Sequence, residues 1–486
     1  MAGRLATTPS TELVNVPKVV LGRIVAPDED AIIIRTADGL TLRLARFTDG
    51  DLVAIASARE QTLSALMDLD IQDTTLFLAA VGRAWLGSLE TARTGVLEHV
   101  SRTTELPVEM LAQDYRAIGH ALSHRAYVYD LFAVELGDEW AMDEWRRVQA
   151  STVRAYPRGI VVHGLVGNTP VAGIASIARG LITRNMNLAK VAARDPLSPM
   201  FFAQVCAQVD SEHPLVRGLS IGYWEHSDPV GERATCLGDA VCLWGGDEGI
   251  AAMRANARPG APVLEFGPKR SLAVIDLDAA DPEVVAMRLA TEVSFYEQEA
   301  CVSPQRLFLK GDYERLRDPL RRFLDIAAQC APKVTAEPDA HAHVSFARLE
   351  AAYRGWPLTC GRDWTIIEAP DPNDVREHPL GRTLYIHSVG SLDEVAEHLD
   401  ETVQTVGVFP WHIALPHRDA WARRGIARIV ELGLSRHPRK GFSHDGLRAL
   451  NSLVRFVSVE RPIDHYYKYL DEPYAEGAER DLFFHD

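Results

Sequence analysis

The chain has 486 residues, of which 47% are hydrophobic and 24% are charged, and this length supports more than one hydrophobic core. Its formal net charge of -16 argues against duplex nucleic acid or an anionic membrane surface as the main partner, because both repel an acidic protein. Six cysteines without regular spacing, an N-terminus without a basic segment before an apolar run, and no apolar stretch of roughly 20 residues predict a cytoplasmic protein without disulfides or a transmembrane segment.

The N-terminal part of the chain predicts a small β module over residues 1–56. Apolar and polar residues alternate along 19–25, 31–35 and 40–44, and Asp38-Gly39 supplies a hairpin turn before the last of these runs. From about residue 57 to residue 155 the apolar residues recur at helical spacing instead. We therefore expect helices to follow the β module.

Beyond residue 159, short apolar runs alternate with helical patterns. The runs are 160–162, 188–191, 241–244 and 263–266, and then 307–309, 365–367, 383–386 and 406–409. Such alternation predicts an α/β protein with doubly wound parallel sheets. A break between the two sets predicts one domain over 57–278, a second over 279–455, and a tail over 456–486 that packs on another domain or subunit.

Cys301 lies where a long helical pattern gives way to the strand-like run at 305–309. A thiol at such a junction can act as a nucleophile. The other five cysteines lie mostly in helical or strand patterns and are predicted to be small core residues. Four segments upstream of Cys301 each supply a group that thioester or aldehyde chemistry needs.

The first two of these segments end strands at one predicted crevice. Asn168, in the Gly-Asn-Thr-Pro stretch after the run at 160–162, can aim its amide into the cleft and hold an oxyanion, although an Asn before a helix is also a common N-cap. Lys190 ends the next strand, where its ammonium suits ribose hydroxyls or a phosphate. An exposed surface lysine explains that position equally well.

The other two segments follow later strands. Gly245 and Gly246 allow backbone N-H groups to approach a pyrophosphate, but the full Gly-x-Gly-x-x-Gly spacing is missing and a tight turn explains them nearly as well. Glu265 can move protons for a cysteine nucleophile, or it is simply solvated. The histidine clusters lack metal-ligand spacing backed by carboxylates, so no metal site is expected.

The order of these segments resembles the aldehyde dehydrogenase superfamily and, within it, the LuxC-type acyl-CoA reductases, the fatty-acid reductase component of bacterial luminescence systems. The resemblance covers about residues 100–455, and it is carried by 167–170, 179–185, 266–271 and 298–301. It implies a Rossmann-type cofactor domain, here 57–278, beside an α/β catalytic domain, with the small β module in front.

The resemblance also implies a reaction. Cys301 would attack an acyl thioester and hold the acyl group, and hydride from a nicotinamide would then give a thiohemiacetal that releases an aldehyde. Asn168 and the backbone N-H of Cys301 would bind the oxyanion. Because an ordinary thiol is only a few per cent thiolate at neutral pH, we expect the site to lower the pKa of Cys301.

The cofactor prediction rests on two positions where the chain departs from the superfamily. Lys190 would contact the adenosine ribose, but the glutamate that grips the ribose hydroxyls is replaced by Ala193, followed by Arg194. Loss of a carboxylate and gain of a guanidinium suit a 2′-phosphate, which favours NADPH. The element that binds the nicotinamide ribose is replaced around 377–382, so no ligand is assigned there.

Glu265 occupies the position at which hydrolytic aldehyde dehydrogenases keep a water-activating base. Its role is left open between proton transfer to the thiohemiacetal and structural support. The leading prediction is NADPH-dependent reduction of a fatty acyl thioester, by a homo-oligomer that receives its acyl group from CoA, an acyl-protein synthetase or a carrier protein. The alternatives are an NAD(P)-dependent aldehyde dehydrogenase that forms the acid, and an acyl-transfer subunit that uses Cys301 without a nucleotide.

Overall fold

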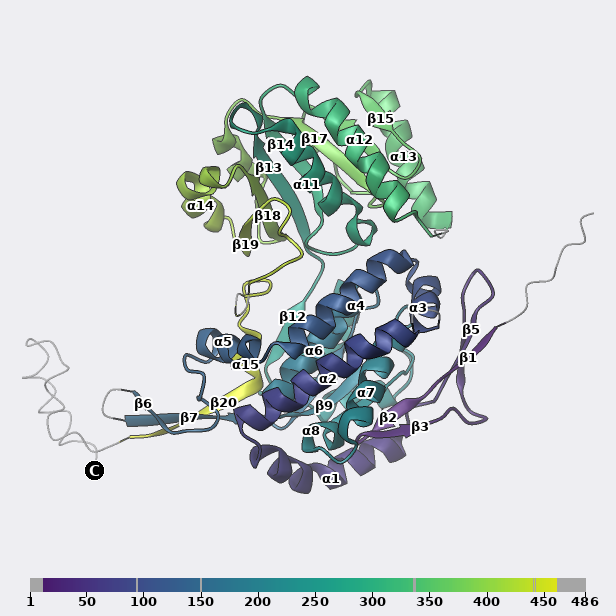
Figure 1. Cartoon of the computed structure of the whole chain (residues 1–486), viewed down its shortest axis with the longest axis vertical. Coiled ribbons are helices and arrows are strands. Elements are labelled where there is room, and N and C mark those ends of the chain that lie inside the picture. The colour runs from purple at the N-terminus through teal and green to yellow at the C-terminus, as the bar shows by residue number, and fades with distance from the viewer. Residues whose placement is uncertain are drawn as a thin grey trace, which may run out of the picture.

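The computed structural model describes residues 12–92, 95–148, 151–334, 338–439, 441 and 443–460. Two α/β bodies lie one above the other in Figure 1, each built on a seven-stranded sheet, and two three-stranded sheets flank the lower body. The predicted α/β fold with parallel sheets is confirmed. Within the described residues, no helix combines the length and the apolar character needed to cross a membrane.

The first seven-stranded sheet carries the strand ends that the sequence singled out. Its order is β12 (Val263–Phe266), β11 (Ala240–Trp244), β8 (Ile160–Gly164), β9 (Met186–Lys190), β10 (Leu219–Gly222), β2 (Lys18–Val20) and β3 (Arg23–Val25). The five strands from β12 to β10 run parallel. All residues of β8 and β10 are buried, because helices cover both faces of the sheet.

Helices connect and cover these strands (Figure 1). The helices of the lower body are α1 (Asp49–Met67), α2 (Ile71–Ala92), α3 (Val96–Thr104), α4 (Val108–Ser123), α5 (Arg125–Glu135), α6 (Pro170–Ile182), α7 (Leu197–Asp210), α8 (Pro214–Arg217), α9 (Val230–Cys236) and α10 (Asp247–Ala255). The long helical stretch expected after residue 57 corresponds to α1 through α5.

The N-terminal strands divide between two sheets. Strands β1 (Leu13–Val16), β5 (Thr41–Leu44) and β4 (Ile32–Arg35) form a small sheet, with Gly39 at φ 92 in the predicted hairpin turn. Strands β2 and β3 instead extend the first large sheet, where β2 pairs antiparallel with β10. The β module predicted from alternation is therefore joined to the neighbouring sheet, a connection that local patterning does not reveal.

The second seven-stranded sheet forms the upper body. Its order is β15 (Leu358–Cys360), β16 (Thr365–Glu368), β17 (Thr383–Ser388), β14 (Pro304–Lys310), β13 (Arg270–Asp276), β18 (Val403–Phe409) and β19 (Arg428–Glu431). Its helices are α11 (Pro282–Ser294), α12 (Glu314–Cys330), α13 (Pro338–Arg354) and α14 (Ala414–Ala422). The sheet includes β13, so the chain enters it before residue 278; the division into domains stays a prediction.

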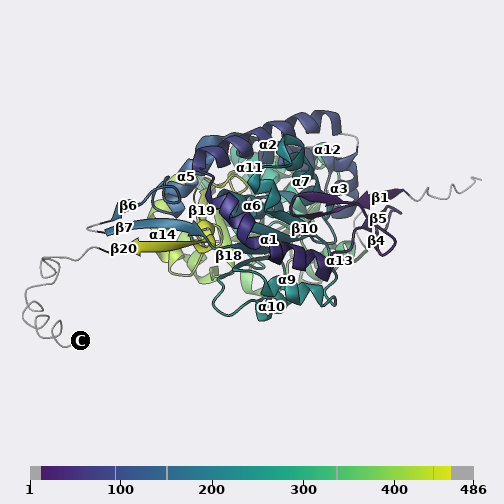
Figure 2. The same cartoon turned by 90° about the horizontal axis from the view of Figure 1, so that it is seen from below.

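The last described segment returns to the lower body. Helix α15 (Ala449–Leu453) packs Ala449 and Leu453 against the first sheet, and β20 (Val454–Val459) pairs antiparallel with β7 (Ser151–Pro157), which pairs with β6 (Arg146–Val148). These three strands form an arm that projects to one side of the molecule (Figure 2). Residues 443–448 therefore lead from the upper body to α15. Most of the tail predicted over 456–486 lies outside the described residues.

Candidate active site

Cys301 lies in a turn between the short helix η2 (Phe295–Gln298) and β14. Three residues before it, 296–298, have φ values of 52, 52 and 64, a left-handed conformation that is uncommon for residues other than glycine. The buried Gln298 amide holds this turn, because it donates to the carbonyls of Pro304 and Thr383. The predicted junction of helix and strand is present, and the thiol is partly exposed.

The other five cysteines differ in burial. Cys206 and Cys242 are buried, as predicted for core residues. Cys236, Cys330 and Cys360 are exposed, so the prediction is wrong for them. Each is the last residue of its helix or strand, and element ends reach the surface even where the pattern leading to them is apolar.

Asn168 contacts the segment that carries Cys301. It lies in the loop between β8 and α6, and its Nδ2 donates to the carbonyl of Glu299 at 2.9 Å. The residue at the N-cap position of α6 is Thr169, not Asn168. The Asn168 side chain is therefore directed to the turn that carries Cys301, although the two segments lie far apart in sequence.

The predicted cofactor residues lie at the ends of neighbouring strands. Lys190 is the last residue of β9, and its Nζ lies 6.0 Å from the centre of the Tyr223 ring. Burial lowers the pKa of its ammonium. Beyond β11, Gly245 has φ 140 and Gly246 is the N-cap of α10, and a Cβ added to either would meet no described atom within 4 Å. The backbone there is open to a phosphate, but Asp247 and Glu248 place negative charge in the same helical turn.

Arg194 does not point into open space. Its guanidinium donates to Glu299 at 2.8 Å and to the carbonyl of Thr104 at 2.6 Å, whereas Ala193 beside it is exposed. The predicted contact between Arg194 and a 2′-phosphate stays a prediction, and a phosphate would have to compete with Glu299 for the guanidinium. Like Asn168, Arg194 contacts the turn that carries Cys301.

Glu265 forms an ion pair on the first sheet. Both of its carboxylate oxygens accept from the guanidinium of Arg254 on α10. Side chains alternate along β12, so Glu265 lies on the face opposite Phe266. Of the two roles left open for Glu265, this geometry favours structural support.

The environment of Cys301 opposes ionisation of the thiol. Burial raises the pKa of Cys301 to about 12, and the negative charge of Asp445 raises it further, whereas Arg428 acts in the opposite direction. The expected lowering of this pKa is therefore wrong for the protein as described. The physical reason is that burial and a neighbouring carboxylate outweigh one cation.

Two buried charges that the sequence did not reveal hold the nucleophile turn. Arg382 is 1% exposed, and its Nε donates to the carboxylate of Glu297 at 3.0 Å, while its Nη2 donates to the carbonyl of Ala331. The backbone N-H of Gly381 donates to the carbonyl of Glu297 at 2.9 Å. The sequence contains one signal for Arg382. The element that usually binds the nicotinamide ribose is replaced at 377–382, and Arg382 is the last residue of that stretch.

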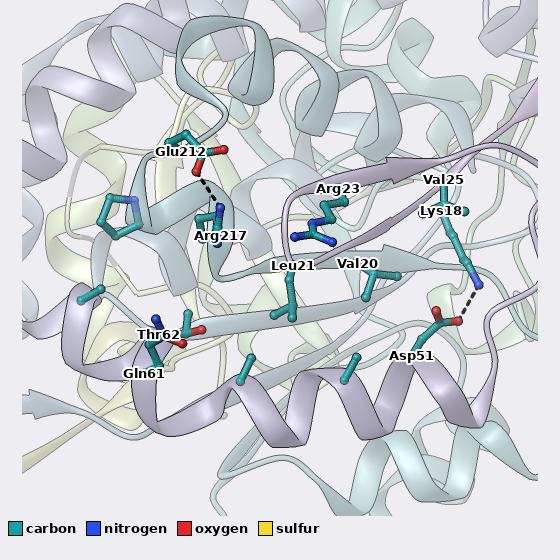
Figure 3. A pocket seen from close by; sticks show the side chains of 14 residues that line it. Lys18, Val20, Leu21, Arg23, Val25, Asp51, Gln61, Thr62, Glu212 and Arg217 are labelled. Atoms are coloured by element: carbon teal, nitrogen blue, oxygen red, sulfur yellow. Dashed lines mark hydrogen bonds and ion pairs between the residues drawn. The ribbon is translucent and has the colours of Figure 1, made fainter.

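A cavity of about 670 Å³ lies elsewhere, between α1 and the β2–β3 hairpin (Figure 3). Charged residues Lys18, Arg23 and Arg217 line it together with Asp51 and Glu212, and Lys18 and Arg217 pair with the two acids. Among the described residues that line this cavity, none is a predicted site residue. The turn that carries Cys301, which Asn168 and Arg194 contact through Glu299, is therefore the better candidate for the active site.

The fold defines the class of protein. Solved structures with the same architecture include an NADP-dependent glyceraldehyde-3-phosphate dehydrogenase from Bacillus halodurans, with a TM-score of 0.73 at 16% identity over 92% of this chain and 99% of that one. Aldehyde dehydrogenase C from Pseudomonas syringae gives a TM-score of 0.72 at 14% identity over 92% and 97%. The chain has the aldehyde dehydrogenase fold.

The family follows from the sequence. The model of the family described as acyl-CoA reductase (LuxC) matches residues 66–456. A long-chain acyl-protein thioester reductase from Vibrio harveyi is 32% identical over 454 residues, 92% of this chain and 94% of the relative. A protein of the same description from Photorhabdus luminescens is 33% identical over 82% of this chain and 84% of its own length. The chain belongs to the LuxC family of acyl-CoA reductases and is an oxidoreductase that converts fatty acyl thioesters to aldehydes.

Proposed function

We propose that this protein reduces a long-chain acyl group, presented as a protein-bound thioester, to the fatty aldehyde with NADPH as the reductant. The observation that carries the proposal is the convergence of Asn168 and Arg194 on the turn that bears Cys301. The relatives that match most of the chain are named for long-chain acyl-protein substrates. An acyl-protein synthetase or a carrier protein would supply such a substrate in the cytoplasm.

In this proposal Cys301 Sγ forms the new bond to the acyl carbon, and the carrier leaves as a thiol. Asn168 Nδ2 would turn from the Glu299 carbonyl to the developing oxyanion, together with the backbone N-H of Cys301. NADPH would supply the hydride that reduces the acyl group. Lys190 and the open backbone at Gly245 and Gly246 would hold the nucleotide at the strand ends.

The ion pair between Glu265 and Arg254 supports reduction over the aldehyde dehydrogenase alternative. Formation of an acid requires a base that activates water against the acyl-enzyme, and both carboxylate oxygens of Glu265 already accept from the Arg254 guanidinium. A reductase needs no such water. The nucleotide-independent acyl-transfer alternative would leave without a role the turn at Gly245 and Gly246, where an added Cβ would meet no described atom within 4 Å.

The test is a reductase assay with tetradecanoyl-CoA and with an acylated protein as substrates. Loss of nicotinamide absorbance and formation of tetradecanal are followed with NADPH or NADH at matched concentrations. We expect aldehyde with NADPH, about the same activity in Cys236→Ala, which removes an exposed cysteine, and no aldehyde in Cys301→Ala. Aldehyde made by Cys301→Ala would contradict the assignment of the nucleophile, and a large preference for NADH would contradict the cofactor proposal.

A further inference from the structure

Helix α13 presents an apolar stripe to solvent at one edge of the upper body (Figure 1). The α13 stripe consists of Ala342, Phe346, Leu349 and Tyr353. Phe346 is 68% exposed, Leu349 70% and Tyr353 92%, and these are the three most exposed large hydrophobic side chains in the described part of the chain. Single exposed apolar residues are ordinary, but a contiguous exposed stripe marks an interaction surface.

The opposite face of α13 is fixed to the upper body. Ala347 and Ala351 are buried in the same core cluster as Ile367 of β16. Arg348 Nε donates to Thr365 Oγ1 at 2.9 Å, at the start of the same strand. The helix therefore keeps one orientation, and the α13 stripe is directed away from the sheet.

The spacing of the α13 stripe is that of a coiled-coil seam. Its four residues follow one another at intervals of four, three and four residues. Such a seam packs against a second helix, because each side chain inserts between side chains of the facing helix. The exposed residues Ser345 and Ala352 beside the stripe are small, which lets a second helix approach closely. The α13 stripe therefore fits a helix.

The α13 stripe is complementary to a second copy of itself. Two α13 helices can pack antiparallel about a two-fold axis that passes between residues 347 and 348. In that register Ala342 of one copy faces Tyr353 of the other, and Phe346 of one copy faces Leu349 of the other. The smallest side chain of the stripe thus meets the largest, which fills each layer of the contact without a void.

The charges beside the α13 stripe agree with the antiparallel register. Glu350 is the only carboxylate between residues 341 and 354, and it forms an ion pair with Arg354 of its own helix at 2.9 Å. In the antiparallel register Glu350 of one copy lies beside His343 of the other. A parallel pair would instead bring Glu350 beside Glu350 of the other copy, and like charges repel. The antiparallel arrangement is therefore favoured.

The area of the α13 stripe sets the strength expected of this contact. Phe346, Leu349 and Tyr353 together expose roughly 400 Å² per copy. A standard interface buries about 800 Å² per partner, so pairing of α13 alone is a weak contact. Association through it should consequently depend on protein concentration.

We propose that two copies of this protein associate through α13, packed antiparallel in the register that places Ala342 of one copy against Tyr353 of the other. The contact covers the apolar stripe on both copies. It goes beyond the proposed reaction and does not depend on it.

The first experiment measures the mass of the full-length protein by size-exclusion chromatography with light scattering. At about 100 μM, a concentration at which weak interfaces form, we expect Phe346→Glu to have about half the mass of wild type. Glutamate is a good helix former and Phe346 is exposed, so the substitution leaves the fold intact. Val53→Glu, at a position that is 64% exposed on α1, is the matched control and should keep the wild-type mass.

The second experiment tests the register with a disulfide. In a protein whose exposed cysteines Cys236, Cys330 and Cys360 are replaced by serine, Ala342→Cys combined with Tyr353→Cys should give a covalent dimer on mild oxidation. Tyr353→Cys alone should give none, because the antiparallel register separates its two copies by about 16 Å along the helix axis.

The outcomes distinguish the possible occupants of the stripe. Equal masses for wild type and Phe346→Glu, with no disulfide in the double variant, overturn the proposal and assign the stripe to a helix of a different protein. A disulfide in Tyr353→Cys alone overturns the antiparallel register, since parallel helices would bring the two copies of residue 353 together. Neither experiment uses substrate or NADPH, so failure of this inference leaves the proposed function untouched.

Discussion

At the scale of single residues, the site is defined by the partners of each polar group. Asn168 binds a backbone carbonyl of the nucleophile turn, Arg194 binds Glu299 in the same turn, and Glu265 is held by Arg254. Two of the three groups therefore contact the turn that positions Cys301. Substrate and cofactor would have to exchange with these contacts.

Replacement of Asn168 tests its role at the oxyanion. We expect Asn168→Ala to lower kcat by about 10²- to 10³-fold, because loss of one oxyanion donor typically has that effect. Asn373→Ala, at an exposed position, is the control and should leave kcat unchanged. Single-turnover reduction of tetradecanoyl-CoA measures the change, and a loss confined to KM would assign Asn168 to substrate binding instead.

Asp114 gives a pH prediction. Burial raises its pKa to about 7 from an ordinary 3.8, even though the hydroxyl of Tyr296 donates to it. Between about pH 4 and about pH 7, Asp114 keeps its proton in the folded protein but has lost it in the unfolded chain. The contribution of Asp114 to the free energy of unfolding is therefore fully present below about pH 4 and is lost as the pH rises through about 7.

Asp114→Asn cannot titrate, and so it should lose less stability than wild type when the pH is raised from about 5 to about 8. The difference should be on the order of 1 kcal/mol or more, since one unit of pKa shift corresponds to about that free energy. Thermal unfolding at the two pH values measures it. Parallel losses in the two proteins would show that Asp114 is ionised at both.

At the scale of elements, the decisive feature is the left-handed stretch at 296–298 that precedes Cys301. Two segments far apart in the chain hold it: Asp114 of α4 accepts from Tyr296, and the consecutive residues Arg382 and Thr383 donate to Glu297 and Gln298. Without these contacts the backbone would prefer another conformation, because left-handed residues other than glycine are strained. The position of the nucleophile thus depends on packing between elements.

Removal of Arg382 tests this dependence. We expect Arg382→Leu to destabilise the protein by about 3–5 kcal/mol, because it removes the guanidinium from the buried Glu297 and leaves it with Lys333, whose Nζ lies 3.7 Å from Glu297 Oε2. Arg321→Leu breaks an exposed ion pair with Asp318 and should change stability by less than about 1 kcal/mol.

Denaturant unfolding measures the free energy of unfolding of Arg382→Leu and of Arg321→Leu. The rate of Cys301 alkylation by iodoacetamide is a second measurement, and it should change in Arg382→Leu alone. A loss of stability for Arg382→Leu no larger than that of the control would contradict a holding role for the pair.

At the scale of the whole molecule, the described chain passes from the lower body to the upper body at the start of β13 and returns through 443–448. The return leads through α15 into β20, the last strand of the arm of β6, β7 and β20 (Figure 1). The arm carries exposed apolar side chains: Val148 is 53% exposed, Phe456 42% and Val459 50%. We propose that the arm forms the contact of a homo-oligomer, which buries these side chains.

Phe456→Glu tests the arm. We expect the variant to elute as a smaller species than wild type, because a buried charge opposes association. Leu415→Glu replaces an apolar side chain that is 56% exposed on α14 and should leave the oligomer unchanged. Size-exclusion chromatography with light scattering measures the mass, and an unchanged mass for Phe456→Glu would exclude the arm as the contact.

The sequence by itself determined the fold class and the family, and it singled out Cys301 as the predicted nucleophile. Those features depend on signals that can be seen along the sequence. Buried strands are continuously apolar, helical patterns follow them, and the motifs occur in the same order as in the family. The juxtaposition of Asn168 with the Cys301 turn was implied only by the resemblance, because Asn168 follows β8 of the first sheet whereas Cys301 precedes β14 of the second.

Only the tertiary structure decided what each charged group does. Arg194 meets Glu299, Glu265 meets Arg254, and Asp445 comes close enough to raise the pKa of Cys301. Successive side chains of a strand point to opposite faces of the sheet, so a shift of one residue changes the face on which a charged group lies. The pKa of a group depends on its burial and on charges from segments far away in sequence. Those quantities depend on the folded arrangement, and for that reason the electrostatic state of the nucleophile was predicted with the wrong sign.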